Sequence, residues 1–144
     1  MTLPPEEVDR VAERLFTAFV EHDYDAARAL LAPGFRGWGN AHGQEMDADG
    51  FLAILPVMRQ QIGRHRYDDV RRMMTGDGFV EQHRVRATVA DGKELDFGDA
   101  CVVARIDHDG LVERLDEYID TAHARRILRS LAAGEAVSQD SGSS

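Results

Sequence analysis

The hydrophobic pattern of this chain changes near residue 65, and that change constrains the fold more than any other feature. Before it, apolar residues recur at helical spacing, and after it they alternate with polar residues as they do along a strand. Three turn signals divide the second half at even intervals: GDG at 76–78, DG at 91–92 and DG at 109–110. Short Gly-containing turns of this kind join neighbouring antiparallel strands. The sequence therefore predicts a meander of four strands, over 65–74, 79–90, 94–107 and 111–119.

The first 62 residues predict three helices, which makes the fold class α+β. The first helix begins at Pro4 and Pro5 and ends near His22, and one of its faces is apolar: Val8, Val11, Ala12, Leu15, Phe16 and Phe19. A second, short helix is expected over 24–32, and a third over 50–62 with a kink at Pro56, because proline removes a backbone hydrogen bond. The glycine-rich stretch 34–44 reads as a short strand that runs into a loop. A last short helix is expected after Asp120.

Length and composition favour one small globular domain over residues 1–132. The chain has 144 residues, of which 43% are hydrophobic and 30% charged, and this suits a single core. Residues 133–144 have no apolar period, so a disordered tail is expected there. The net charge of −9 disfavours nucleic acids and anionic membranes as partners, because phosphates need a basic surface. We expect a cytoplasmic protein, since the sequence has no signal-peptide pattern and no apolar run of membrane-spanning length.

One predicted strand, 94–107, is apolar in both of its phases. One phase includes Ala100, Val102 and Ala104, and the other includes Cys101 and Val103. A strand that is apolar on both sides is expected to be covered on both sides. The helices of so short a chain can cover only one side of the sheet. We therefore expect a homodimer that packs through the second face.

Glu117 is the residue whose place is hardest to explain by packing. It shares its phase with Leu115 and Ile119 in the last predicted strand. If that face is internal, desolvation raises the pKa of the carboxyl group and makes it useful as a general acid or base. The alternative is a structural acid that is paired with an arginine or lies on a wet part of the strand.

Arg84 and Arg86 share the polar phase of the strand 79–90, which suits a solvent face or the wall of a polar cavity. Arg84 reaches Glu117 only if the curvature of the sheet and the register of its strands bring the two side chains to the same place. An ion pair between them would keep the Glu117 carboxyl group ionised. His83 lies among apolar neighbours and is interpreted as a core or interface histidine. The sequence has no phosphate-binding loop, nucleophile elbow or Cys/His metal cluster, so we expect either chemistry without a cofactor or metal, or plain binding.

The order of these parts resembles the nuclear transport factor 2-like superfamily, and within it the SnoaL-like polyketide cyclases and limonene epoxide hydrolases. The resemblance covers about residues 6–125, and its most specific piece is the last strand in DGLVERLDEYIDTA, residues 109–122. It implies a cone-shaped fold in which a strongly curved antiparallel sheet wraps the three N-terminal helices around a deep apolar pocket, commonly as a dimer.

The resemblance also implies candidate catalytic residues. In both enzyme groups a catalytic acid precedes the aromatic residue of the last strand, and the matching position here is Glu117. Epoxide hydrolases also have an Arg-x-Asp pair on an earlier strand. The matching residues are Arg84 and Arg86, so the arginine is present and its acid partner is absent. Asp99 and Asp68 are the candidates for a second acid.

Further matches concern the pocket wall. The Tyr-x-Asn pair with which epoxide hydrolases hold the attacking water matches Trp38 and Asn40 after a one-residue slip. The histidine of SnoaL-like sites matches Val102. Ketosteroid isomerases match less well, because their tyrosine and base fall on Leu15 and Gly39. We therefore take Trp38, Asn40, Arg86 and Val102 as candidate substrate-binding residues.

Two functional hypotheses follow from these residues. The first is a small cofactor-independent enzyme that opens epoxides, cyclises or isomerises an apolar, oxygenated small molecule of polyketide or terpenoid type, with Glu117 and Arg84 as catalytic residues. The second is a non-catalytic binding protein that uses the same pocket. A third hypothesis, a scaffold subunit, has little support except that proteins of this fold commonly form dimers. The fold alone does not decide among the three functions.

Overall fold

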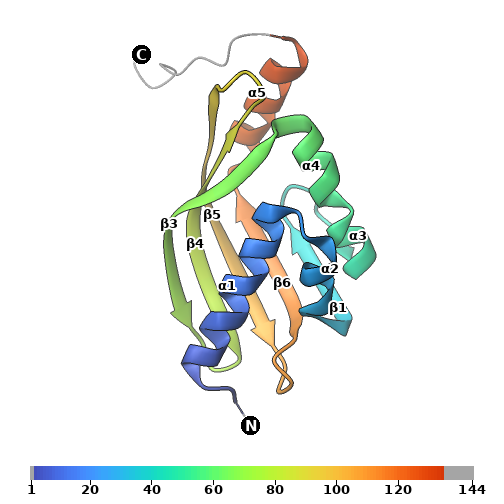
Figure 1. Cartoon of the computed structure of the whole chain (residues 1–144), viewed down its shortest axis with the longest axis vertical. Helices are drawn as coiled ribbons and strands as arrows, with labels where there is room; N and C mark the ends of the chain where they lie inside the picture. The colour runs from blue at the N-terminus through green and yellow to red at the C-terminus, as the bar shows by residue number, and fades with distance from the viewer. Residues whose placement is uncertain (1, 135–144) are drawn as a thin grey trace.

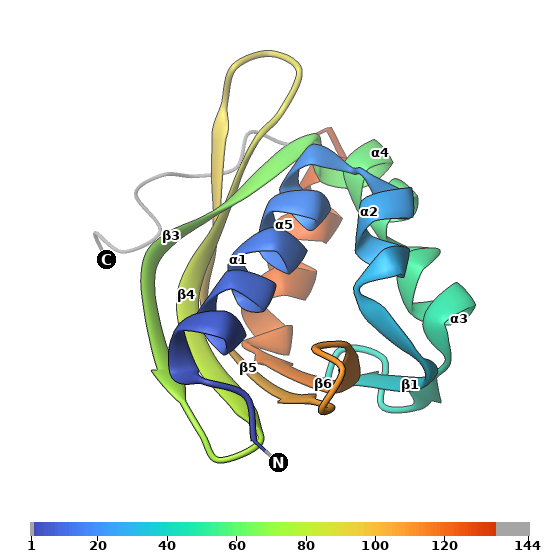
Figure 2. The same ribbon diagram turned by 60° about the horizontal axis from the view of Figure 1, so that its bottom comes forward.

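The computed structural model describes residues 2–134. A curved sheet of six strands, in the order β2-β1-β6-β5-β4-β3, wraps around the helices (Figure 1). The view in Figure 2 shows α1 on the concave side, between β3 and β4 on one flank and β1 with α2, α3 and α4 on the other. The sheet does not close into a barrel, because β2 and β3 are its two edges. This is the α+β cone predicted above.

The first helix, α1, spans Pro5–Glu21 and buries its predicted face. It begins at a proline and has Glu6 and Glu7 in its first turn, where acids complement the helix dipole. His22 ends it in a left-handed conformation, with φ of 55°. Asp23 then caps α2, Tyr24–Ala29, by accepting a hydrogen bond from the Ala26 backbone N–H at 3.1 Å. This sharp turn sets α2 against the side of α1.

The third predicted helix consists of two helices, α3 at Ala48–Leu52 and α4 at Ile54–Ile62. The chain bends at Ala53, three residues before Pro56. Proline has no backbone N–H, so one carbonyl group in the preceding turn lacks its helical hydrogen-bond donor. The predicted inner residues Leu52, Leu55 and Ile62 are buried. The kink is therefore confirmed, and it is sharp enough to divide the helix.

The strand β1, Leu31–Gly39, begins earlier than predicted. The second helix stops at Ala29, and Pro33 and Gly34 lie within the strand, at an irregularity between Leu31 and Arg36. Proline is tolerated there because the ladder is already interrupted. β1 runs parallel to β6 and pairs on its other side with the short β2, Glu45–Met46, so the sheet is not wholly antiparallel as predicted.

The four-strand meander agrees with the prediction to within two residues at every end. Its strands are β3 at Arg64–Met74, β4 at Gly78–Thr88, β5 at Glu94–Ile106 and β6 at Val112–Ile119. Three irregularities were not predicted: the register shifts near Asp69, which has a φ of 55°, near Gly98, with a φ of 86°, and between Arg105 and Ile106 in the pairing of β5 with β6. Each shift moves the following side chains of its strand to the other face.

The helix α5, Thr121–Ala132, packs against β5 at the upper end of the molecule in Figure 1. Asp120 caps it by accepting a hydrogen bond from the His123 backbone N–H at 3.0 Å. Ile127 packs with Ile62, Ala87 and Leu95 in a small second core beside the main one. The predicted disordered tail lies outside the described residues, apart from Ala133 and Gly134. None of the described helices is both long enough and apolar enough to cross a membrane.

Candidate functional site

The concave face of the sheet places Glu117 in the interior. Glu117 lies opposite Val102 of β5 and Gly39 of β1, and its neighbour along the face, Leu115, is 2% exposed. Burial raises the pKa of the Glu117 carboxyl group, while His83 and His42 act in the opposite direction. The residue as a whole is nevertheless partly exposed to solvent.

Tyr67 on β3 has the same combination of depth and partial accessibility. Burial, and then the negative charges of Glu117 and Glu81, raise the pKa of the Tyr67 phenol well above its ordinary value. The phenol therefore keeps its proton at every physiological pH. Tyr67 and Glu117 come from strands three positions apart in the sheet, and the curvature brings their side chains within electrostatic reach of one another.

A buried ion-paired group lies behind Tyr67. Glu81, which is 0% exposed, accepts a hydrogen bond from the Arg72 guanidinium at 2.7 Å. The other Glu81 oxygen lies 2.5 Å from Nδ1 of His83, which is 2% exposed. Arg72 also pairs with Asp9 at 2.7 Å and with Glu13 at 3.1 Å, so the group is tied to α1. A carboxylate on Nδ1 fixes the orientation of the imidazole ring.

Two more histidines continue this polar group on the other side of Tyr67. His65 Nε2 is 3.1 Å from the Tyr67 hydroxyl oxygen, and the His22 and His65 rings meet edge to face with centroids 5.6 Å apart. His22 Nδ1 is 3.4 Å from the hydroxyl oxygen of Tyr24. Three buried ring nitrogens among the described residues have no hydrogen-bond partner: His22 Nε2, His65 Nδ1 and His83 Nε2. Unpaired polar atoms of this kind are rare in protein interiors and cluster where function requires them.

The neutral state of His65 has a measurable consequence for stability. Burial, with the nearby His22 and His83, lowers the pKa of His65 from 6.5 to about 4. Between these two pH values His65 is protonated in the unfolded chain and neutral in the folded chain. The free energy of unfolding therefore falls as the pH drops from 6.5 to 4. This group alone is expected to account for about 3 kcal/mol of that loss.

Chemical denaturation at several pH values checks this expectation. His65→Asn should show a smaller decline in unfolding free energy between pH 6.5 and 4 than the wild type does. His108→Asn, at an exposed turn, serves as the matched control and should keep the wild-type slope. An unchanged slope in His65→Asn would mean that the buried imidazole is not the titrating group.

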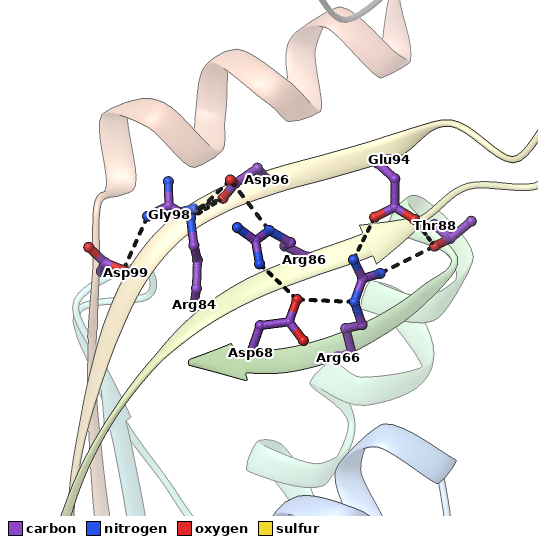
Figure 3. A network of polar contacts seen from close by, with 9 residues as sticks. All are labelled: Arg66, Asp68, Arg84, Arg86, Thr88, Glu94, Asp96, Gly98 and Asp99. Carbon is purple, nitrogen blue, oxygen red and sulfur yellow. Dashed lines mark hydrogen bonds and ion pairs between the residues drawn. The ribbon is translucent and has the colours of Figure 1, made fainter. Parts of the chain in front are cut away.

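Arg84 and Glu117, whose pairing depended on the curvature and register of the sheet, do not meet. Arg84 lies on the convex face, where its Nε is 2.9 Å from Asp96 Oδ2 and its Nη1 is 3.4 Å from Asp99 Oδ1 (Figure 3). Arg86 pairs with Asp68 at 2.9 Å on the same face. Residues of even number on β4 point away from the helices, since Glu81 and His83 occupy the inner positions. The solvent-face reading of these arginines is thus the correct one.

The second-acid candidates lie in the same outer network. Asp68 bridges Arg66, at 3.1 Å, and Arg86 (Figure 3). Asp99 is 83% exposed at its side chain. Neither carboxylate shares a face with Glu117. A push-pull reaction between Glu117 and one of these acids is therefore wrong for this fold.

The remaining candidates have mixed positions. Trp38 lies on the convex face, where its ring contacts Tyr118 at a centroid distance of 5.3 Å. The Asn40 side chain clamps the β6 backbone: Nδ2 donates to the Ile119 carbonyl at 2.9 Å, and Oδ1 accepts from the Ile119 N–H at 3.0 Å. Both of its polar atoms are therefore engaged. Val102 is 0% exposed and faces inward opposite Glu117.

Tyr67, His65 and the Glu81–His83 pair were missed as site residues by reasoning from the sequence. The signal that could have found Glu81 and His83 is the inner phase of β4, in which they alternate with residues of the opposite face. His83 was interpreted as a core histidine, and its burial is confirmed. Its contact with the Glu81 carboxylate, two residues earlier, shows that His83 also has a charged partner in the core.

The convex face has a hollow of its own. It has a volume of about 610 Å³ and is lined along one cross-strand row by Arg71, Gln82, Cys101 and Tyr118. His83 and Ala100, which are buried, also line this hollow. Val103, 37% exposed, and Tyr118, 47% exposed, are apolar residues on the same face.

A SnoaL-like domain model matches residues 12–115. The chain belongs to the SnoaL-like family. The match ends two residues before Glu117. No curated protein matches the chain.

Solved structures share the fold of this SnoaL-like chain. A nuclear transport factor 2-like protein of unknown function from Burkholderia pseudomallei is 19% identical, with a TM-score of 0.73, covering 85% of this chain and 97% of that one. A putative polyketide cyclase from Xanthomonas campestris is 16% identical, with a TM-score of 0.70 and coverages of 88% and 97%. An LEH-like epoxide hydrolase from M. tuberculosis is 18% identical, with a TM-score of 0.67 and coverages of 90% and 98%.

Proposed function

We propose that this SnoaL-like chain is a small cofactor-independent enzyme in which Glu117 transfers protons to and from an apolar, oxygenated small molecule. The observation that carries the proposal is Glu117 itself, a partly exposed residue that lies opposite Val102 on the inner face and whose carboxyl pKa is raised by burial. A carboxyl group in such a place exchanges protons near neutral pH more readily than one in water.

The walls around Glu117 define the kind of substrate. Val102 lies opposite Glu117 and Leu115 beside it on the same face, and both are buried apolar residues of the main core. Such a lining favours a hydrophobic ring system with few oxygen atoms. Names among the structural neighbours, polyketide cyclase and epoxide hydrolase, belong to enzymes for molecules of this kind and support the proposal.

A screen of the wild-type protein tests the proposal. Three panels cover the reaction classes: cyclic terpene-like epoxides, aromatic β-dicarbonyl esters that can cyclise, and β,γ-unsaturated ketones that can isomerise. Mass spectrometry and chiral chromatography would follow the products. We expect turnover in one panel, and its loss in Glu117→Gln. Turnover that survives this substitution would remove Glu117 from the mechanism.

The alternative is a non-catalytic binding protein. The observation in its favour is that Arg84, the catalytic partner expected from the sequence, is engaged with Asp96 and Asp99 on the opposite face. A binding protein would bind members of these panels without changing them, and Glu117→Gln would alter only the affinity.

We also propose that a second copy of the chain covers the convex face. Val103, Tyr118 and Trp38 present apolar surface there around the 610 Å³ hollow, and two such faces can bury one another in a symmetric dimer. In gel filtration at micromolar concentration the wild type should elute as a dimer and Val103→Asp as a monomer. Val57→Asp, at a position of α4 that is 53% exposed, should remain dimeric. A monomeric wild type would contradict this proposal.

A further inference from the structure

The hollow on the convex face lies where two strands of the sheet are irregular. Asp69, at the register shift of β3, lines it, and so does Asp99, which follows the shift of β5 at Gly98. Such an irregularity bends its strand and increases the local twist. Neither Glu117 nor Tyr67 lines this hollow, so a molecule bound there would not contact the residue to which we assign proton transfer.

The hollow contains two side chains of opposite charge, Arg71 and Asp69, that have neither an ion pair nor a hydrogen bond among residues 2–134. Asp69 acts only from a distance, on Arg86. The second acid of the lining, Asp99, is 83% exposed at its side chain and lies 3.4 Å from Arg84. By contrast, Arg84 and Arg86 each have an acid at 2.9 Å in the outer network. The hollow therefore offers one free guanidinium group and one free carboxylate.

A row of side chains across four strands leads from Arg71 to an aromatic ring. Arg71 is in register with Gln82, Gln82 with Cys101, and Cys101 with Tyr118. The Gln82 side chain has no hydrogen-bond partner within the described part of the chain, so its amide can donate and accept. Tyr118 is 47% exposed, and the Trp38 ring contacts its ring at a centroid distance of 5.3 Å. The far end of the row thus presents an aromatic surface.

We propose that this hollow binds a zwitterion with an aromatic side chain, that is, an aromatic amino acid. The ligand carboxylate pairs with the Arg71 guanidinium group, whose planar fork matches it, and the ligand ammonium group pairs with Asp69. The ligand ring lies against Tyr118. Neighbouring strands are about 4.8 Å apart, so the row from Arg71 to Tyr118 is about 14 Å long. The arginine side chain spans part of this length, and the amino acid spans the rest.

A ligand with only one charge fits the hollow less well. An anion beside Arg71 is repelled by Asp69 and Asp99, and a cation beside Asp69 is repelled by Arg71. A zwitterion compensates both free charges at once. This inference adds a binding site on the opposite face from Glu117 and involves no chemistry there. It therefore goes beyond the proposed function and does not depend on it.

Three related ligands test the charge requirement by isothermal titration calorimetry. L-Tryptophan is the zwitterion, indole-3-propionate lacks its ammonium group, and tryptamine lacks its carboxylate. L-Tryptophan should bind at least about 10-fold more tightly than either analogue, the usual effect of losing a hydrogen bond between charged groups. No binding of L-tryptophan, or equally tight binding of either analogue, would overturn the proposal.

Two substitutions then assign the charges to their residues. Arg71→Met should weaken L-tryptophan binding by about 10-fold and should not weaken tryptamine binding, which has no carboxylate to lose. Asp69→Asn should weaken L-tryptophan binding by a similar factor and should not weaken binding of indole-3-propionate. Asparagine is the suitable replacement there, because it tolerates the positive φ of 55° at this position.

Arg10→Met is the matched control, because Arg10 is an exposed arginine of α1 that does not line the hollow. Its affinity for L-tryptophan should equal that of the wild type. All titrations use the full chain at one protein concentration, because Tyr118 also belongs to the surface on which a second copy is proposed to pack. Unchanged L-tryptophan affinity in Arg71→Met or Asp69→Asn, or equal losses for all three ligands, would show that these charges do not recognise the ligand and would overturn the proposal.

Discussion

Replacing Glu117 with glutamine is expected to lower kcat/KM by about 10²-fold to 10⁴-fold on any substrate found in the panels, the range typical of losing a general acid or base. The amide has nearly the same shape and volume as the carboxyl group, so the apolar walls beside Val102 should remain intact. It cannot accept and release a proton at neutral pH. The affinity for an unreactive analogue should therefore change by no more than a few-fold. Steady-state kinetics and a binding titration of the analogue measure the two effects.

Glu113→Gln is the matched control, because Glu113 lies on the same strand at an exposed position, where its carboxylate is 3.8 Å from the Arg105 guanidinium. Its turnover should equal that of the wild type. Similar losses in the two variants would point to a general effect of β6 charge rather than to chemistry at Glu117.

Stability provides a second criterion for the same substitution. Burial raises the pKa of Glu117 above 4.5, so the folded chain holds a proton that the unfolded chain releases as pH rises past this value. The wild type therefore loses stability as pH rises from 4.5 through the folded-state pKa of Glu117. Glutamine has no such proton, and Glu117→Gln should be at least as stable as the wild type at pH 7. Activity lost together with stability gained distinguishes a functional acid from a structural one.

The part of the fold that the sequence predicted is the part set by local signals. The hairpin turns, the apolar face of α1 and the effect of Pro56 all depend on neighbours within a few residues, and they lie where expected. The parallel pairing of β1 with β6 joins residues about eighty positions apart, such as Gly37 and Leu115, and no local pattern encodes it.

The position of Glu117 on an inner face was predictable because β6 keeps its alternation from Leu115 to Ile119. Tyr67 was not, because the register shift at Asp69 changes which residues of β3 face inward. His65 and Tyr67 are inward before the shift, and Arg72 reaches α1 after it. An alternation of inward and outward residues assumed along the whole of β3 therefore assigns some of its residues to the wrong face. The shift at Gly98 has the same effect on β5, where Leu95 and Val102 are both fully buried.

Arg84 shows a different limit. The family resemblance matched an arginine at the expected place in the sequence, but the match was out of phase with the sheet. Glu81 and His83 hold the inner positions of β4, and the arginines hold the outer ones. Burial of each residue, which only the three-dimensional structure supplies, decides between these two phases.

Removing Arg72 is expected to have the largest effect on stability, a loss of about 3–5 kcal/mol in the free energy of unfolding, as for other buried ion pairs that lose one partner. The Glu81 side chain is only 1% exposed, and the Arg72 side chain, 10% exposed, is its cationic partner at 2.7 Å. In Arg72→Ala the carboxylate would stay buried without this charge. Asp9 and Glu13 would also lose their link from α1 to β3. Urea denaturation at pH 7 measures the loss.

Two further variants separate the buried charge from the lost packing. Arg72→Met combined with Glu81→Leu removes both charges and keeps the volume, and it should recover most of the stability because no uncompensated carboxylate remains. Arg105→Ala removes an exposed arginine, 52% accessible and 3.8 Å from Glu113, and should cost less than about 1 kcal/mol. If Arg72→Ala were as mild as Arg105→Ala, Arg72 would not be the group that keeps Glu81 charged in the interior. Glu81 would then lack the fixed charge with which it orients His83, and the rigid support under the Tyr67 ring would have to come from Phe16 and the surrounding core alone.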